Sequence, residues 1–193
     1  MPDQPALALI EFSSIAVGTR ALDAMLKRAH VDLLRAGSIQ PGKFAILFAG
    51  DVGSVEESFT EACRIGAEAL IDRVLLHDVH EAVRAAASGH RGPWTNDTLG
   101  IIETETLAAV LDAADAAVKG ASVEIVEIRL GDGLGGKGLA HFIGEQSDVE
   151  AAIQIGSARL AGRSIKVCTA IIPRADQTLL ESGSQSTRFG EGW

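Results

Sequence analysis

The chain has 193 residues, of which 47% are hydrophobic and 22% charged, and its formal net charge is -9. This apolar fraction is enough to bury a core, so the composition excludes wholesale disorder, and the length suits one large domain or two small ones. The acidic balance and the lack of any cluster of basic residues argue against a nucleic-acid partner. The apolar stretches are too short to cross a bilayer, so no membrane partner is expected.

The N-terminal sequence carries no secretory signal, which predicts a cytoplasmic location. The two cysteines, Cys63 and Cys168, lie far apart in the sequence and are expected to be reduced packing residues. No serine lies in a Gly-x-Ser-x-Gly elbow, and neither cysteine has a plausible neighbouring base. We therefore predict no catalytic residue and no metal site.

The sequence contains an internal repeat, which organises everything else. Short motifs of the first half recur in the second half in the same order and at a constant spacing, interrupted only by a two-residue insertion in the second copy. The matched pairs are Leu9-Ile10-Glu11 with Ile101-Ile102-Glu103, Asp23 with Asp115, Lys27 with Lys119, Val31 with Val123, Gly42-Lys43 with Gly136-Lys137, and Gly50 with Gly144. The repeat predicts a tandem duplication, with one domain over 1–93 and a second over 94–193.

Each half shows the same succession of patterns: a strand, an Ala- and Leu-rich helix, two strands joined by a Pro/Gly turn, a second helix and a last strand. The predicted segments are strands over 6–12, 31–37, 43–49 and 69–76 with a first helix over 17–29, then strands over 98–104, 123–130, 137–144 and 164–172 with a first helix over 106–119. This β-α-β-β-α-β order is typical of an α+β, ferredoxin-like domain with helices against one face of the sheet.

Local signals set three boundaries. Ser147 with Glu150 three residues later has the spacing of a capping box, which predicts the start of the last long helix, running to about Ala161. The stretch 88–97 is rich in Gly, Pro and polar residues and is expected to be an exposed connection. The Ser- and Gly-rich tail from about Ser182 is expected to be mobile.

The loop from Gly131 to Lys137 matches two phosphate-loop patterns, G-x-G-x-x-G and G-x-x-x-x-G-K. Phosphate binding by such loops needs a helix directly behind the glycines, whereas a strand-like segment follows here. The first half keeps only the Gly42-Lys43 step and lacks the glycine run. The pattern is therefore interpreted as a turn into a strand, and a small-molecule-binding regulatory or enzyme module that uses this loop is kept as the alternative function.

His77 and His80, with acidic neighbours, could suggest metal ligands, but no third ligand pattern accompanies them. A charged segment after a strand is more often a solvated rim. Acidic pairs such as Glu11 and Glu103 occur in both halves, which favours an architectural role over a catalytic one.

Several spaced motifs carry a family resemblance. They are the segments 23–31 and 115–123, Pro41-Gly42-Lys43-Phe44, Gly50-Asp51-Val52, Gly144-Glu145 and Ile171-Ile172-Pro173-Arg174. With these motifs, the chain resembles the bacterial microcompartment (BMC) shell family over nearly its whole length, and in particular the propanediol-utilisation type of the tandem-domain (BMC-T) branch.

This resemblance implies a structural protein rather than an enzyme. It implies a homotrimer of tandem domains that forms a pseudohexameric disc and tiles into a shell in the bacterial cytoplasm. Other hexameric and pentameric shell proteins, and encapsulated enzymes, are the implied partners. The residues implied at the disc edges are Asp23, Lys27, Asp115, Lys119 and Arg174.

The resemblance also implies a central pore, lined in alternation by loops from both halves. The implied pore residues are Ser38, Ile39, Gln40, Pro41, Gly131, Asp132, Gly133, Leu134 and Gly135. The resembled type carries a cysteine before Pro-Gly-Lys that holds an iron–sulfur cluster, whereas this chain has Gln40, whose amide cannot replace a thiolate. We therefore expect no cofactor and a pore for small polar metabolites; a redox conduit within the shell is the second alternative.

Overall fold

The computed structural model describes residues 5–94, 98–131 and 133–188. The first half contains β1 (Ala6–Phe12), α1 (Ile15–Arg28), β2 (Asp32–Ile39), β3 (Lys43–Gly50), α2 (Val52–Ile65), a 3-10 turn η1 (Ala67–Ala69), β4 (Leu70–Leu76) and α3 (Glu81–Ala87). The second half contains β5 (Thr98–Thr104), α4 (Leu107–Gly120), β6 (Glu124–Leu130), β7 (Gly138–Gly144), α5 (Gln146–Arg159), β8 (Val167–Ile172) and α6 (Gln177–Gln185). The predicted α+β duplication is confirmed, and each half ends in one additional short helix.

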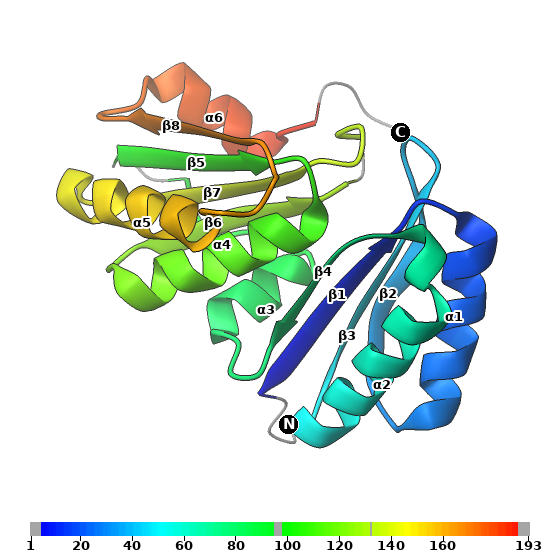
Figure 1. Cartoon of the computed structure of the whole chain (residues 1–193). Coiled ribbons are helices and arrows are strands. Elements are labelled where there is room, and N and C mark those ends of the chain that lie inside the picture. Colours follow the sequence, from blue (N-terminus) through cyan, green and yellow to red (C-terminus); the bar gives the residue numbers. More distant parts are fainter. Residues whose placement is uncertain (1–4, 95–97, 132, 189–193) are drawn as a thin grey trace.

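Each half forms a four-stranded antiparallel sheet, with strand order β2-β3-β1-β4 in the first and β6-β7-β5-β8 in the second. The register is also repeated, because Leu7 lies opposite Ala49 and the aligned Leu99 lies opposite Ile143. Two long helices cover one face of each sheet: α1 and α2 on the first, α4 and α5 on the second (Figure 1). We call this face of each sheet its helix face and the opposite face its outer face.

Strand β1 is buried along its whole length because both faces of its sheet are covered. Its even-numbered residues, including Ile10 and Phe12, belong to the core beneath α1 and α2. Its odd-numbered residues, Leu7 and Leu9, belong instead to the core shared with the second half. Period-two alternation thus divides one strand between two cores.

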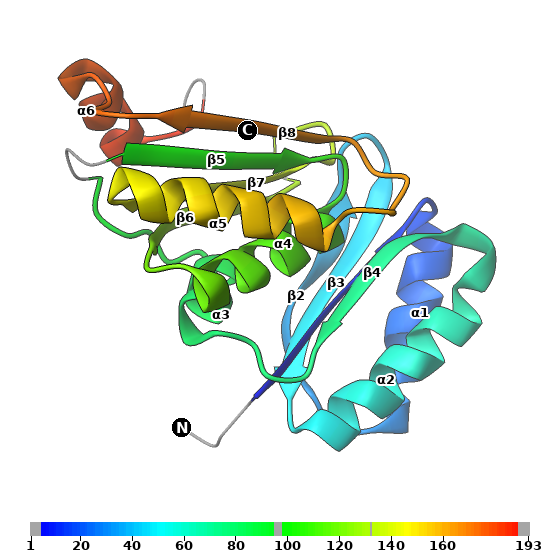
Figure 2. The same cartoon turned by 60° about the vertical axis from the view of Figure 1, so that its left-hand side comes forward.

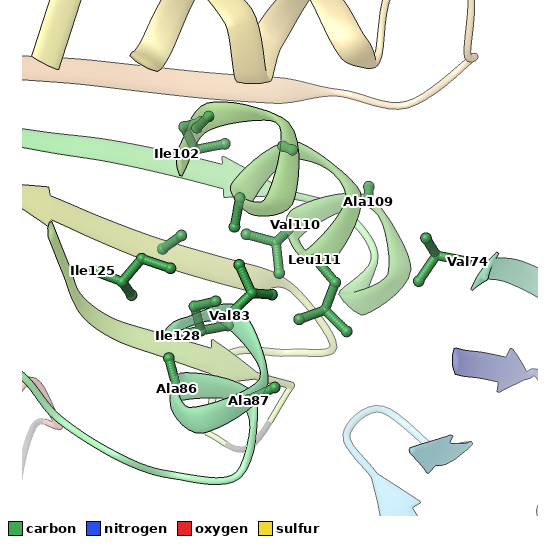
Figure 3. Close-up of a cluster of buried hydrophobic side chains, with 14 of the residues drawn as sticks. Val74, Val83, Ala86, Ala87, Ile102, Ala109, Val110, Leu111, Ile125 and Ile128 are labelled. Atoms are coloured by element: carbon green, nitrogen blue, oxygen red, sulfur yellow. The ribbon is translucent and has the colours of Figure 1, made fainter. Parts of the chain in front are cut away.

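The junction between the halves is built around α4, which lies between the helix face of its own sheet and the outer face of the first sheet (Figure 2). Leu111, Ala109 and Val74 lie together at this junction, and α3 brings Val83 to the same core beside Ile128 (Figure 3). Alanines such as those at positions 113, 114 and 117 are fully buried on α4. Their small side chains allow close approach on several sides of the helix at once.

The start of α5 differs from the sequence prediction. The helix begins at Gln146, its N-cap residue is Glu145, and no side chain caps it. Ser147 therefore lies inside the first turn, and the capping-box interpretation is wrong. Glu150 instead accepts a hydrogen bond from the Gln146 side chain at 2.8 Å.

The connection and the tail are more closely packed than expected. The amide of Gly92 donates to the carbonyl of Val126 at 2.7 Å, and the indole ring of Trp94 lies against Gly183. Residues 182–185 belong to α6 rather than to a mobile tail, because the Arg91 guanidinium holds the carbonyls at its C-terminal end. Residues 95–97 of the connection and 189–193 of the tail lie outside the described residues.

None of the described helices has the length and apolar character needed to cross a bilayer.

Gly156 allows α5 to approach α4, and replacing it is expected to destabilise the chain. A Cβ atom there would lie 2.7 Å from the Ile102 side chain and 2.9 Å from the Ala113 carbonyl oxygen. We expect Gly156→Val to lower the free energy of unfolding by about 2–3 kcal/mol, measured by urea denaturation, because backbone cannot move aside cheaply. Gly53→Val at the exposed start of α2, where the nearest such atom is 3.5 Å away, should change it by less than about 0.5 kcal/mol.

Candidate functional site

The two loops expected at the pore meet within one chain. The Lys43 ammonium donates to the carbonyl of Gly136 at 3.4 Å, and a Cβ on Gly131 would lie 3.0 Å from the Ile39 side chain. The first loop, 38–41, joins β2 to β3, and the second, 131–135, joins β6 to β7. Asp132 lies outside the described residues. The structure therefore brings the two predicted pore loops together at Ile39 and Gly131.

The second loop has no phosphate-loop context. Gly131, Gly133 and Gly135 adopt positive φ angles of 74°, 70° and 61°, which is backbone that favours glycine. The chain then enters strand β7 and not a helix. The loop therefore lacks the helix N-terminus that a phosphate loop uses, and it serves as the turn into a strand that the sequence suggested.

A buried carboxylate lies beside these loops. Glu11 is fully buried; its Oε1 accepts from the amide of Ala108 at the start of α4 at 2.9 Å, and its Oε2 lies 3.6 Å from the Lys43 ammonium. Burial raises the pKa of Glu11 to about 7, an increase that the amide and the ammonium offset only in part. The duplicated Glu103 is 39% exposed and pairs with Lys137 at 2.8 Å.

The duplicated Asp-Lys pairs have different surroundings. Asp115 and Lys119, 2.7 Å apart, hold the turn between β4 and α3: Asp115 accepts from the amide of His80 at 2.8 Å, and Lys119 donates to the carbonyl of Asp78. Asp23 and Lys27, 2.6 Å apart, are exposed, and among the described residues they bond only to each other. The Asp115–Lys119 pair thus makes contacts within the chain, whereas the equivalent Asp23–Lys27 pair faces solvent.

Arg174, the last of the predicted disc-edge residues, lies in the exposed turn between β8 and α6. Its turn corresponds to the turn that Asp115 and Lys119 hold in the first half, because β4 and β8 pair identically with the first strand of their sheets. The structure does not bring Arg174 next to Lys27 or Lys119 within one chain.

A charge network at the junction escaped the sequence analysis. Arg163 lies 2.5 Å from Asp72 and 3.2 Å from Asp112, and Arg159 lies 2.7 Å from Asp112. The side chains of Asp72 and Asp112 are only 12% and 11% exposed. Residues so far apart in the sequence carry no spacing signal, so only the fold reveals the network.

Apolar residues show the same contrast between the halves. Leu107 at the first position of α4 and Val83 on α3 are 2% and 0% exposed, because they pack into the junction. Their counterparts, Ile15 at the first position of α1 and Leu179 on α6, are 45% and 41% exposed. The two surfaces that meet inside the chain therefore recur, uncovered, at its two ends.

The two histidines considered as metal ligands, His77 and His80, have other surroundings. His80 caps α3, its ring accepting from the amide of Ala82 at 3.2 Å, while His77 is an exposed residue near Glu56. Across 5–94, 98–131 and 133–188, no three His, Cys, Asp or Glu side chains are grouped as metal ligands would be. Cys63 is buried and Cys168 exposed, and both are free thiols.

Comparison with known proteins decides the family. A model of the BMC domain matches the chain twice, over residues 6–79 and 98–175. The chain is also 36% identical over 174 residues to the bacterial microcompartment shell protein PduT of Citrobacter freundii, which covers 90% of this chain and 95% of PduT. The chain belongs to the bacterial microcompartment shell proteins. The resemblance stated from the motifs is thereby confirmed, and with it the structural role and the location in a shell within the bacterial cytoplasm.

Further relatives agree with this membership. A crystal structure of a microcompartment protein from Desulfitobacterium hafniense DCB has a TM-score of 0.82 and 38% identity, covering 91% of this shell protein and 98% of that chain. The carboxysome assembly protein CcmO of Synechocystis sp. is 26% identical over 170 residues, which cover 80% of this chain and 56% of CcmO. The fused permuted hexameric shell protein MSM0275, at 20% identity, covers 81% of this chain and 84% of its own with a TM-score of 0.59, and shows the same fold.

Proposed function

We propose that three copies of this shell protein close into a pseudohexameric disc with a central pore for small polar metabolites. The discs tile edge to edge with one another and with hexameric and pentameric shell proteins. The role is structural and not enzymatic; PduT, a relative that is 36% identical over 174 residues, is a shell protein. The observation that carries the proposal is the pair of unmatched surfaces at the two ends of the chain.

These surfaces fit a closed ring. Inside the chain, the second half packs on the first through a head-to-tail contact, so repeating that contact between chains gives either a ring or an open filament. Two equivalent units in each chain make six positions for three chains. A ring would cover Ile15 on α1 with the outer face of a neighbour's second sheet, as Leu107 is covered within the chain.

The polar contacts of the junction can be repeated in the same way. In a ring, Lys27 would donate to the carbonyl of Arg174 of the next copy, as Lys119 donates to that of Asp78. Asp23 would accept from the amide of Asp176, as Asp115 accepts from that of His80. The predicted disc-edge set therefore gains a second role at the contact between chains, and its contact with a neighbouring disc stays a prediction.

The pore follows from the same symmetry, because the loops 38–41 and 131–135 would alternate around the axis. Gln40 is exposed in the first loop. An amide at this position supplies hydrogen-bonding groups without charge, which suits uncharged polar metabolites. A cluster-bearing redox conduit is disfavoured at the same position, and iron analysis of anaerobically purified protein should find no cluster.

Light scattering of the purified protein tests the ring. We expect a mass three times the 20.1 kDa chain, with flat sheets in negative-stain micrographs after concentration. Lys27→Asp should weaken the trimer and abolish the sheets, because it reverses the charge at the repeated contact. The matched change Arg64→Asp, on α2 away from both surfaces, should preserve them. A stable monomer or dimer that never forms sheets contradicts the proposal.

A further inference from the structure

Four arginines surround a cavity of about 230 Å³ between the halves. They come from four separate segments: Arg35 from β2, Arg91 from the connection after α3, Arg129 from β6, and Arg188 from the end of the described chain. Glu127 is the only carboxylate among the described lining residues. We propose that this cavity binds the phosphate group of a small metabolite.

The charge around the cavity is opposite to that of the molecule. The chain has 17 basic residues against 26 acidic ones, yet the described residues that line the cavity include four arginines and one glutamate. Guanidinium groups are planar donors whose geometry fits phosphate oxygens in pairs, and they keep their charge at any physiological pH.

Two of these arginines also anchor the C-terminal segment, and this contact does not remove their charge. Arg91 donates to the carbonyl of Gly183 at 2.5 Å, and Arg129 donates to the carbonyl of Thr187 at 2.9 Å. Carbonyl oxygens are uncharged, so the positive potential persists. Glu127 offsets only part of it, since it lies 3.2 Å from Arg91 and also accepts from the Thr187 hydroxyl at 2.6 Å.

Arg35 lies at the exposed side of the cavity. It is exposed, and within the described part of the chain it forms no ion pair. It also lines an adjoining cavity of about 410 Å³ that reaches Ser38 and Ile39 at the start of the first pore loop. A phosphate held by Arg35 would therefore lie beside the route to the pore.

The volume restricts the ligand. A water molecule occupies about 30 Å³ in the liquid, so about 230 Å³ accommodates inorganic phosphate or a short phosphate ester. Ordinary sites for larger ligands exceed about 300 Å³. Failure of this proposal leaves the ring proposal unaffected, because the ring is argued from the exposed surfaces around Ile15 and Leu179 and not from this cavity.

Isothermal titration calorimetry with inorganic phosphate at low ionic strength tests the site. We expect wild-type protein to bind phosphate with one site per chain, and Arg35→Gln to weaken binding about tenfold or more, because a charge-assisted contact is lost. The matched change Arg64→Gln removes an equal charge from α2 and should leave binding unchanged. Arg35 is exposed, so its replacement should also leave the circular dichroism spectrum unchanged.

Glycerol phosphate and acetate complete the comparison. If glycerol phosphate binds more tightly than inorganic phosphate, the site recognises phosphate esters. If the two affinities are equal, the site recognises the phosphate group alone. Either result agrees with the proposal, provided that Arg35→Gln weakens the binding. Acetate that binds as tightly as phosphate overturns the proposed ligand class. No phosphate binding by wild type, or equal loss in Arg35→Gln and Arg64→Gln, overturns the site itself.

Discussion

Replacing Leu179 by aspartate is expected to leave the chain folded and to abolish the trimer. Leu179 is 41% exposed on α6, whereas its counterpart Val83 on α3 is fully buried against the second half. In a ring, burial of the 41% of Leu179 that is exposed would contribute about 1 kcal/mol at each of three contacts, and the cost of burying a carboxylate adds to the loss of this term. Light scattering over a range of concentrations should therefore give the mass of one chain.

The control is a second exposed apolar residue outside the repeated surfaces. Val52 at the start of α2 is 36% exposed, and its counterpart, Gln146, is exposed as well, so the internal junction does not use this position. Val52→Asp should preserve the trimer. Circular dichroism should show the same helix content in both variants, and a Leu179→Asp protein that remains trimeric would contradict the ring.

The sheets and the repeat could be predicted from the sequence because their signals are local. Alternating apolar residues and Pro/Gly turns delimit the strands, and β1 and β5 match their expected bounds. The repeat predicted that loops 38–41 and 131–135 are equivalent, and the family resemblance implied that they lie together at a pore. The start of α5 was missed because Ser147 offered a familiar capping pattern, although alignment with Asp51, the N-cap of α2, points to Glu145.

The different roles of the two copies could not be predicted, since they depend on which copy meets a partner inside the chain. Asp23 and Asp115 are each followed by alanine and, four residues later, by lysine, yet only Asp115 accepts a hydrogen bond from the amide of His80. The charge network around Asp112 and the four arginines around the 230 Å³ cavity could not be predicted either, because their members come from distant segments of the sequence. A symmetric sequence thus yields asymmetric surroundings in one chain, and a ring would restore the symmetry.

The raised pKa of Glu11 predicts that the free energy of unfolding decreases as the pH rises. An unfolded glutamate ionises near 4.5, whereas the pKa of the buried Glu11 is about 7, so the folded chain binds the extra proton between these values. The stability that this proton supplies is fully present below about pH 4.5 and is lost as the pH rises through 7. At about 1.4 kcal/mol per pKa unit, the loss amounts to about 3.5 kcal/mol.

The groups that face Glu11 set the size of this effect. The amide of Ala108 and the ammonium of Lys43 favour its ionised form, whereas burial and the nearby charge of Asp72 disfavour it. Glu11→Gln keeps an oxygen that can accept from Ala108 and removes the ionisation. We therefore expect the variant to match wild type within about 1 kcal/mol at pH 5 and to be about 2–3 kcal/mol more stable at pH 8.

Urea unfolding at several pH values and one fixed protein concentration measures this difference, because assembly also contributes to stability. Glu57→Gln on the exposed face of α2 is the matched control. Its free energy of unfolding should change with pH as steeply as that of the wild type. If the free energy of unfolding of Glu11→Gln also falls with pH as it does in the wild type, the Glu11 carboxylate is not the source of the pH dependence. A flattened curve would instead show that the junction is held most tightly when Glu11 is protonated, so that mild acid strengthens the same contact that the ring would repeat between chains.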